Sequence, residues 1–147
     1  MMVRRLTIAA AACGVAVVLL GSVTSQTARA HGDVTPQLVD ISGLPPLGSD
    51  WRTDNPYVGN ARALEVGASG YSQNCARCHG LQVISGGIAP DLRYLELGKS
   101  GDEWFMTRIR HGAKNQDGTT IMPAFEGLLQ QEAMWAIRTY TASLHQE

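Results

Sequence analysis

The stretch Cys75-Ala76-Arg77-Cys78-His79 decides the fold of this chain. Two residues separate the cysteines and a histidine follows the second, which is the spacing typical of covalent haem attachment. Thiols one helical turn apart can each reach a vinyl-derived carbon at the porphyrin edge, and the adjacent histidine then lies under the iron. We therefore predict one haem c, bound through Cys75 and Cys78, with His79 as an axial ligand of the iron.

Other uses of paired cysteines fit this pattern less well. Two cysteines in an exported chain would ordinarily form a disulfide, but the short spacing and the adjacent histidine argue against it. A zinc site would need a second pair of ligands at close spacing, and the remaining histidines of the exported chain are scattered at His31, His111 and His145. A thioredoxin-like dithiol would need a strand–helix–strand setting, and we see no convincing strands.

Met122 is the predicted second axial ligand. It lies in a loop directly before Pro123, and proline stiffens the backbone and lacks an N–H. Methionines within predicted helices more often fill the core. A thioether ligand raises the reduction potential relative to two histidines and closes the sixth coordination position. The other candidates for this position are Met106, Met134, His111 and His145.

An axial histidine generally donates its second ring N–H to a fixed acceptor. The loop around Pro90 is the predicted source of a backbone carbonyl for His79, because proline makes that loop rigid. The aromatic residues Tyr94, Trp104 and Trp135 could line the haem or belong to the ordinary core. Arg93 could approach a haem propionate, although a solvated arginine is at least as common.

The first 30 residues have the three parts of a secretory signal peptide. Arg4 and Arg5 precede an apolar run of about 15 residues, which is short of the roughly 20 that span a membrane. Ala28-Arg29-Ala30 then resembles a cleavage site. We predict a signal peptide at 1–30, an irregular arm rich in Gly, Pro, Asp and Asn at 31–60, and one domain at 61–147, with no stable membrane insertion after cleavage.

Apolar periodicity predicts an all-α domain. A first helix covers 62–74, with Leu64, Ala68 and Tyr71 on one face, and a last helix runs from about 130 to 144. Ser100 and Glu103 fit a capping box that opens a middle helix ending near Gly112. Removal of the signal leaves nine basic and thirteen acidic residues, and this acidic balance is unsuited to binding nucleic acid.

The residues from about 60 to 147 resemble the class I cytochrome c family. The resemblance rests on the Cys75–His79 motif, Pro90, Leu92, Met122-Pro123, and the two terminal helices. It implies that helices pack around one covalently bound haem and that Gly67 faces the last helix around Ala136 and Tyr140. It also implies a hydrogen bond from His79 to the Pro90 carbonyl and contact between Leu92 and the haem.

Further stretches resemble the soluble periplasmic cytochromes c of alcohol (ethanol) dehydrogenase systems that use PQQ. These stretches are 31–37, 74–81 and 84–93. This resemblance implies a periplasmic one-electron carrier, not an enzyme, that accepts electrons from a PQQ-dependent alcohol dehydrogenase and passes them to a terminal oxidase or another cytochrome. The alternatives are a haem enzyme or gas-binding protein with an open sixth site, and a tethered subunit of a larger oxidoreductase.

Overall fold

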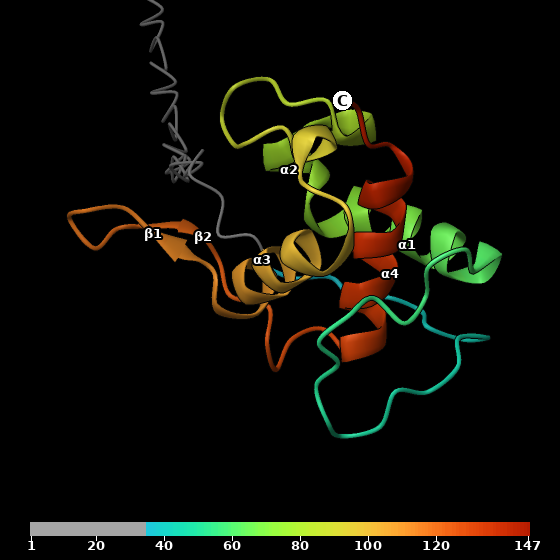
Figure 1. The fold of residues 1–147 in the computed structure, drawn as a ribbon. Coiled ribbons are helices and arrows are strands. Elements are labelled where there is room, and N and C mark those ends of the chain that lie inside the picture. Colours follow the sequence, from blue (N-terminus) through green and yellow to red (C-terminus); the bar gives the residue numbers. More distant parts are fainter. Residues whose placement is uncertain (1–34) are drawn as a thin grey trace, which may run out of the picture. The chain divides into compact units, whose positions relative to one another are not determined.

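The computed structural model describes residues 35–147, so the predicted signal peptide at 1–30 lies outside the described residues. The described chain is mostly helical, as predicted, and Figure 1 shows its elements. In chain order they are α1 (Ala61–Asn74), α2 (Ala76–His79), 3₁₀ helices at Leu81–Val83 and Leu92–Tyr94, α3 (Gly98–His111), β1 (Ala113–Lys114), β2 (Thr120–Met122) and α4 (Gln131–Ser143).

The first and last helices pack against each other, as α1 and α4 in Figure 1 show. A Cβ atom on Gly67 would overlap the backbone carbonyl of Ala136 and crowd the side chain of Tyr140. Only glycine lets the two backbones approach this closely. The expectation that Gly67 faces Ala136 and Tyr140 is therefore confirmed.

The buried face of α1 differs from the prediction. Leu64 and Ala68 are only partly buried, whereas Tyr71 is fully buried as expected. The contact at Gly67 turns the helix so that the face next to the predicted one meets α4. The buried residues of α1 are Ala63, Val66, Gly67, Gly70, Tyr71 and Asn74.

The predicted capping box of α3 is wrong. The helix begins at Gly98, its N-cap residue Leu97 makes no side-chain capping hydrogen bond, and Ser100 lies inside the first turn. Gly98 has φ +74°, a left-handed conformation that glycine adopts without strain. The chain can therefore turn into the helix three residues earlier than a cap at Ser100 would require.

The prediction of a purely helical chain missed a small hairpin. β1 and β2 are antiparallel, with Ala113 paired to Met122 and Lys114 to Thr120. The Gly118 N–H donates to the Asn115 carbonyl at 3.1 Å and closes the turn between them. Strands of two and three residues are too short to show the alternation on which strand prediction depends.

Residues 35–60 form no helix or strand, yet side chains of the helices hold this segment in place. The Leu47 N–H donates to Glu132 at 2.8 Å, and the Arg52 N–H donates to Gln131 at 2.7 Å. Tyr57 is buried, and its hydroxyl donates to the Pro45 carbonyl. Trp51 is partly buried against the core.

A buried ion pair joins α3 to α4. The Arg138 Nε atom lies 2.6 Å from Asp102 Oδ1, and the two side chains are 1% and 8% exposed. Arg138 also donates to the Glu96 carbonyl, while the second oxygen of Asp102 accepts the Asn55 N–H at 3.0 Å. This cluster therefore ties four separate segments of the chain together.

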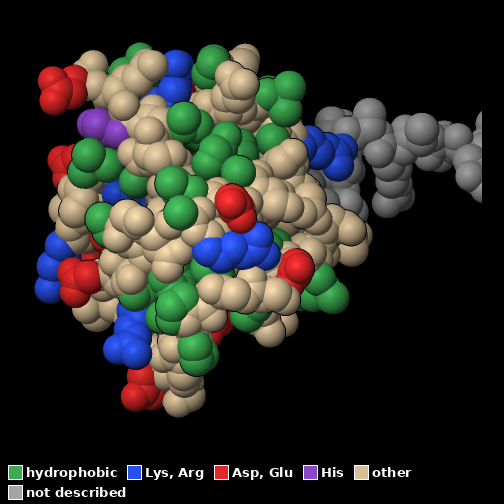
Figure 2. All heavy atoms as spheres, turned by 90° about the vertical axis from the view of Figure 1, so that its right-hand side faces the viewer, with side chains coloured by type: hydrophobic (Ala, Val, Ile, Leu, Met, Phe, Trp, Pro, Cys, Tyr) green, Lys and Arg blue, Asp and Glu red, His purple; other side chains and the backbone are tan. Residues whose placement is uncertain are grey.

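Acidic and basic side chains are interspersed on the face that Figure 2 shows, so that face carries no extended area of one sign. Among the described residues, no helix is both long enough and apolar enough to cross a membrane.

Candidate haem site

The Cys75–His79 stretch continues directly from α1 as one more helical turn. The Cys75 N–H donates to the Tyr71 carbonyl at 2.8 Å, and the N–H groups of Cys78 and His79 donate to the Cys75 carbonyl at 3.1 and 3.0 Å. Helical geometry places residues three and four apart on one side. The thiols of Cys75 and Cys78 and the imidazole of His79 accordingly line the same cavity.

Burial, with a smaller contribution from the nearby Cys78, raises the pKa of the Cys75 thiol to about 12. Among the described residues, the thiols of Cys75 and Cys78 are both free.

The cavity has a volume of about 360 Å³ and a predominantly apolar lining. Its walls come from the segment that leads into the second 3₁₀ helix at Leu92, from α3, from the hairpin and from α4. Besides the motif residues, the side chains that line it include Pro90, Leu92, Trp104, Phe105, Ile109, Ile121, Met122, Phe125 and Ile137.

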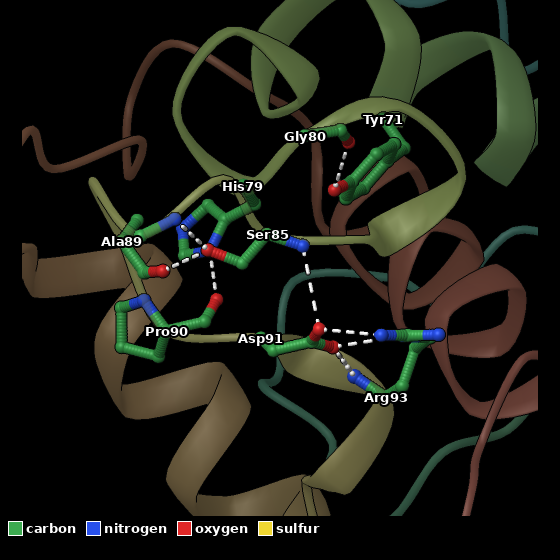
Figure 3. Close-up of polar contacts among 9 residues, drawn as sticks. Tyr71, His79, Gly80, Ser85, Ala89, Pro90, Asp91 and Arg93 are labelled. Atoms are coloured by element: carbon green, nitrogen blue, oxygen red, sulfur yellow. Dashed lines mark hydrogen bonds and ion pairs between the residues drawn. The ribbon is translucent and has the colours of Figure 1, made fainter.

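The loop that carries Pro90 orients the imidazole of His79. The Nδ1 atom of His79 lies 2.9 Å from the Pro90 carbonyl oxygen, and Figure 3 shows how the two residues face each other. A carbonyl oxygen can only accept, so this bond requires a proton on Nδ1, and in the neutral imidazole the lone pair is then on Nε2. Neutral imidazole with a free Nε2 lone pair is the form that binds metals.

The loop that carries Pro90 is itself held by Ser85 and Asp91. The Ser85 hydroxyl donates to the Ala89 carbonyl, and the Ser85 N–H donates to Asp91 at 3.3 Å. Asp91 also accepts two hydrogen bonds from the Arg93 side chain, at 3.0 and 2.7 Å (Figure 3). The Arg93 guanidinium holds the pKa of Asp91 well below its ordinary value, and backbone N–H groups lower it further against the effect of desolvation.

Met122 lines the cavity from β2. Gly112, at φ +70°, brings its backbone so close to the Met122 carbonyl that a Cβ atom would overlap it. The other candidate ligands do not line the cavity. Met106 and Met134 are buried in the cores of α3 and α4, and among the described contacts His111 lies 3.5 Å from Glu126.

The charged side chains that line the cavity are Arg108 and Lys114, both exposed cations. Haem combines a large apolar ring with two anionic propionates. An apolar cavity with two thiols on one turn, an oriented imidazole, a thioether and cations at the rim fits that group. Tyr94 and Trp135 do not line the cavity, and Arg93 pairs with Asp91 instead of facing it.

Sequence reasoning missed several supporting residues. The Tyr71 hydroxyl donates to the Gly80 carbonyl at 2.8 Å, and burial raises the pKa of Tyr71 above its ordinary value, so the hydroxyl keeps its proton. Asp91 carries a local signal, since aspartate before a short helical turn often caps it. Arg108 and Lys114 carry none, because only the folded hairpin and α3 bring them to one cavity.

A helical domain with this cavity defines a c-type cytochrome. Residues 62–140 match the family model described as cytochrome c oxidase, cbb3-type, subunit III. The chain is 55% identical over 132 residues to cytochrome c550 of Pseudomonas aeruginosa, covering 87% of this chain and 90% of that protein. No solved structure gave a significant match.

Two quinohaemoprotein alcohol dehydrogenases of Pseudomonas putida are also similar. ADH IIB is 32% identical over 96 residues and ADH-IIG is 36% identical over 97 residues. These regions are 65% and 63% of this chain but only 13% of each enzyme. The chain belongs to the class I cytochrome c family. It is an electron-transfer cytochrome that carries covalently bound haem c.

Proposed function

We propose that this cytochrome is a periplasmic one-electron carrier, not itself an enzyme, whose electron donor is a PQQ-dependent alcohol dehydrogenase. Cys75 and Cys78 would hold the haem through thioether bonds, and His79 and Met122 would be the axial ligands. Leu92 would pack on the porphyrin, and the Pro90 carbonyl would fix the imidazole of His79. The haem supplies the redox chemistry, while the chain supplies ligands and an apolar pocket.

The observation that carries this proposal is that both thiols, the His79 imidazole and the Met122 side chain line one and the same cavity. A bound thioether closes the sixth position, which favours electron transfer over the binding of oxygen or peroxide. The exposed cavity-lining residues Ile88 and Ile121, 84% and 65% exposed, mark an apolar rim through which electrons could pass.

The ligand assignment is tested by Met122→His. Imidazole in place of the thioether should lower the reduction potential and keep the iron low-spin. The weak sulfur-to-iron band of the oxidised protein in the near infrared should disappear at the same time. An unchanged potential, or a wild-type protein that lacks the band and is high-spin, would instead support the open-site alternative.

The similarity to two quinohaemoprotein alcohol dehydrogenases supports the proposed donor, and the match to a cbb3-type oxidase family supports an oxidase or another cytochrome as acceptor. The test is stopped-flow mixing of the oxidised cytochrome with an alcohol-reduced PQQ dehydrogenase. We expect rapid reduction of the haem. Slow or absent reduction would remove this donor and leave the carrier function intact.

The periplasmic location depends on the predicted signal peptide at 1–30. Mass spectrometry of the protein purified from a periplasmic extract should give the mass of residues 31–147 plus one haem. A mass that retains the first 30 residues would favour the tethered-subunit alternative.

A further inference from the structure

The segment after Met122 is fastened to the carboxyl end of α3. We name residues 122–129 the Met122 loop. The Phe125 N–H donates to the Ile109 carbonyl at 2.9 Å, and the Glu126 N–H donates to the Arg110 carbonyl at 3.3 Å. The side chains repeat this connection, because Arg110 donates to both carboxylate oxygens of Glu126, at 2.8 and 3.3 Å.

Arg110 also lies over the ring of Trp51, which belongs to the segment at 35–60. The guanidinium carbon of Arg110 is 4.0 Å from the centroid of the Trp51 ring. A guanidinium over an indole face is a favourable cation–π arrangement. Trp51 covers the face of the Arg110 guanidinium group and Glu126 binds its edge, so the side chain has few alternative conformations. The Arg110 side chain is only 23% exposed.

Trp51 is itself held to α4. The neighbouring Arg52 donates its N–H to Gln131 at 2.7 Å and a side-chain N–H to the Leu47 carbonyl at 3.2 Å. A continuous set of contacts therefore runs from α4 through Trp51 and Arg110 to Glu126 in the Met122 loop. The segment at 35–60 is thus linked through Arg110 to the Met122 loop, although it does not line the cavity.

We propose that Trp51, Arg110 and Glu126 are positioning residues that set how firmly the Met122 loop holds the sixth coordination position. This inference rests on the proposed ligand role of Met122. We expect Met122 to leave the iron only when the Met122 loop separates from α3. Contacts that hold the loop against α3 would therefore favour ligation. Bidentate and stacked arrangements use the planar fork of arginine, which lysine lacks.

Imidazole is the probe, because it binds the ferric iron only when the loop ligand leaves. In the holoprotein, Glu126→Gln and Trp51→Leu should each raise the affinity for imidazole by about threefold, as expected for a partly exposed pair. The double variant should show less than the product of the two effects, because both act through Arg110. Arg110→Lys keeps the charge, loses the fork, and should behave like Glu126→Gln.

The matched control is Glu65→Gln, which removes the exposed Arg62–Glu65 pair on α1 and should leave the imidazole affinity unchanged. Urea unfolding of each variant separates a general loss of stability from a change at the iron. Equal imidazole affinity in wild type, Glu126→Gln, Trp51→Leu and Arg110→Lys would overturn the positioning role, as would an equal change in the control.

A Met122→Ala variant distinguishes failure of this inference from failure of the proposed ligand. Much tighter imidazole binding by Met122→Ala, with wild-type affinity in the other three variants, overturns the positioning role alone. Equal affinity in Met122→Ala and wild type overturns the ligand assignment and this inference with it.

Discussion

At the scale of single residues, the orientation of the His79 imidazole depends on the carboxylate of Asp91, which does not line the cavity. Asp91 holds the loop whose Pro90 carbonyl accepts from His79, through bonds to Ser85 and Arg93. The pKa of Asp91 is lowered in the folded protein, chiefly by Arg93. A carboxyl pKa that is depressed in the folded protein contributes stability that is fully present above the unfolded value of about 3.9 and is lost progressively as pH falls through that value toward the lower folded pKa.

We therefore expect the free energy of unfolding to depend less on pH in the acid range in Asp91→Asn than in the wild type. The wild type should lose stability between about pH 5 and pH 3 more steeply than the variant, because the variant has no carboxyl to protonate at this position. Urea unfolding of both holoproteins across this range measures the difference. Parallel profiles would show that Asp91 contributes no pH-dependent stability.

The roles of single residues could be predicted where they depend only on neighbours in the sequence. The C-x-x-C-H spacing and the proline after Met122 are visible without a fold. The ion pair of Arg93 with Asp91 was not predicted, and Arg93 was considered for a propionate instead, because a sequence shows that an arginine is present but not which of several anions it meets. Arg108 and Lys114 are separated along the chain and share a cavity only in the folded state.

At the scale of elements, the contact of α1 with α4 is controlled by one missing side chain. Gly67→Ala would drive a methyl group into the Ala136 carbonyl, which cannot move without shifting the helix. We expect a loss of about 3 kcal/mol in the free energy of unfolding, at the upper end for overpacking, despite the higher helix propensity of alanine.

The matched control for Gly67→Ala is Gly86→Ala, where nothing lies within 4 Å of an added Cβ. This change should be neutral or slightly stabilising, because alanine restricts the unfolded chain. Thermal unfolding of both variants measures the contrast. Similar stabilities would show that α1 and α4 can separate at little cost.

The helices were predictable within one or two residues at most ends because their apolar periodicity is strong. The start of α3 was misplaced because a serine and a glutamate three residues apart also occur inside a helix, and the turn at Gly98 was decided by backbone freedom. The hairpin of β1 and β2 was missed because its pairing depends on Gly112 and Met122 meeting across a loop, a contact between residues ten apart.

At the scale of the whole molecule, the buried Arg138–Asp102 pair joins α3, α4, Asn55 and the Glu96 carbonyl. Asp102→Ala would leave a buried guanidinium without its counter-charge. We expect a loss of about 3–5 kcal/mol in the free energy of unfolding.

Addition of Arg138→Met to Asp102→Ala should recover part of that loss, because the double variant buries no unpaired charge. Urea unfolding of the single and double variants forms the cycle. A double variant that is less stable than Asp102→Ala would contradict the expected coupling. This cluster could not have been predicted from the sequence, because the sequence does not show which Asp and Arg residues are buried in the folded protein.

The pairing of the first and last helices also has a consequence for synthesis. A polypeptide made from its amino end presents the thiols of Cys75 and Cys78 while α4 is still missing. The wall that Ile137 supplies to the cavity, and the surface against which Gly67 rests, are therefore added last. Until α4 has been made and has packed against α1, the cavity lacks this wall, and we expect both cysteines to be open to chemical modification.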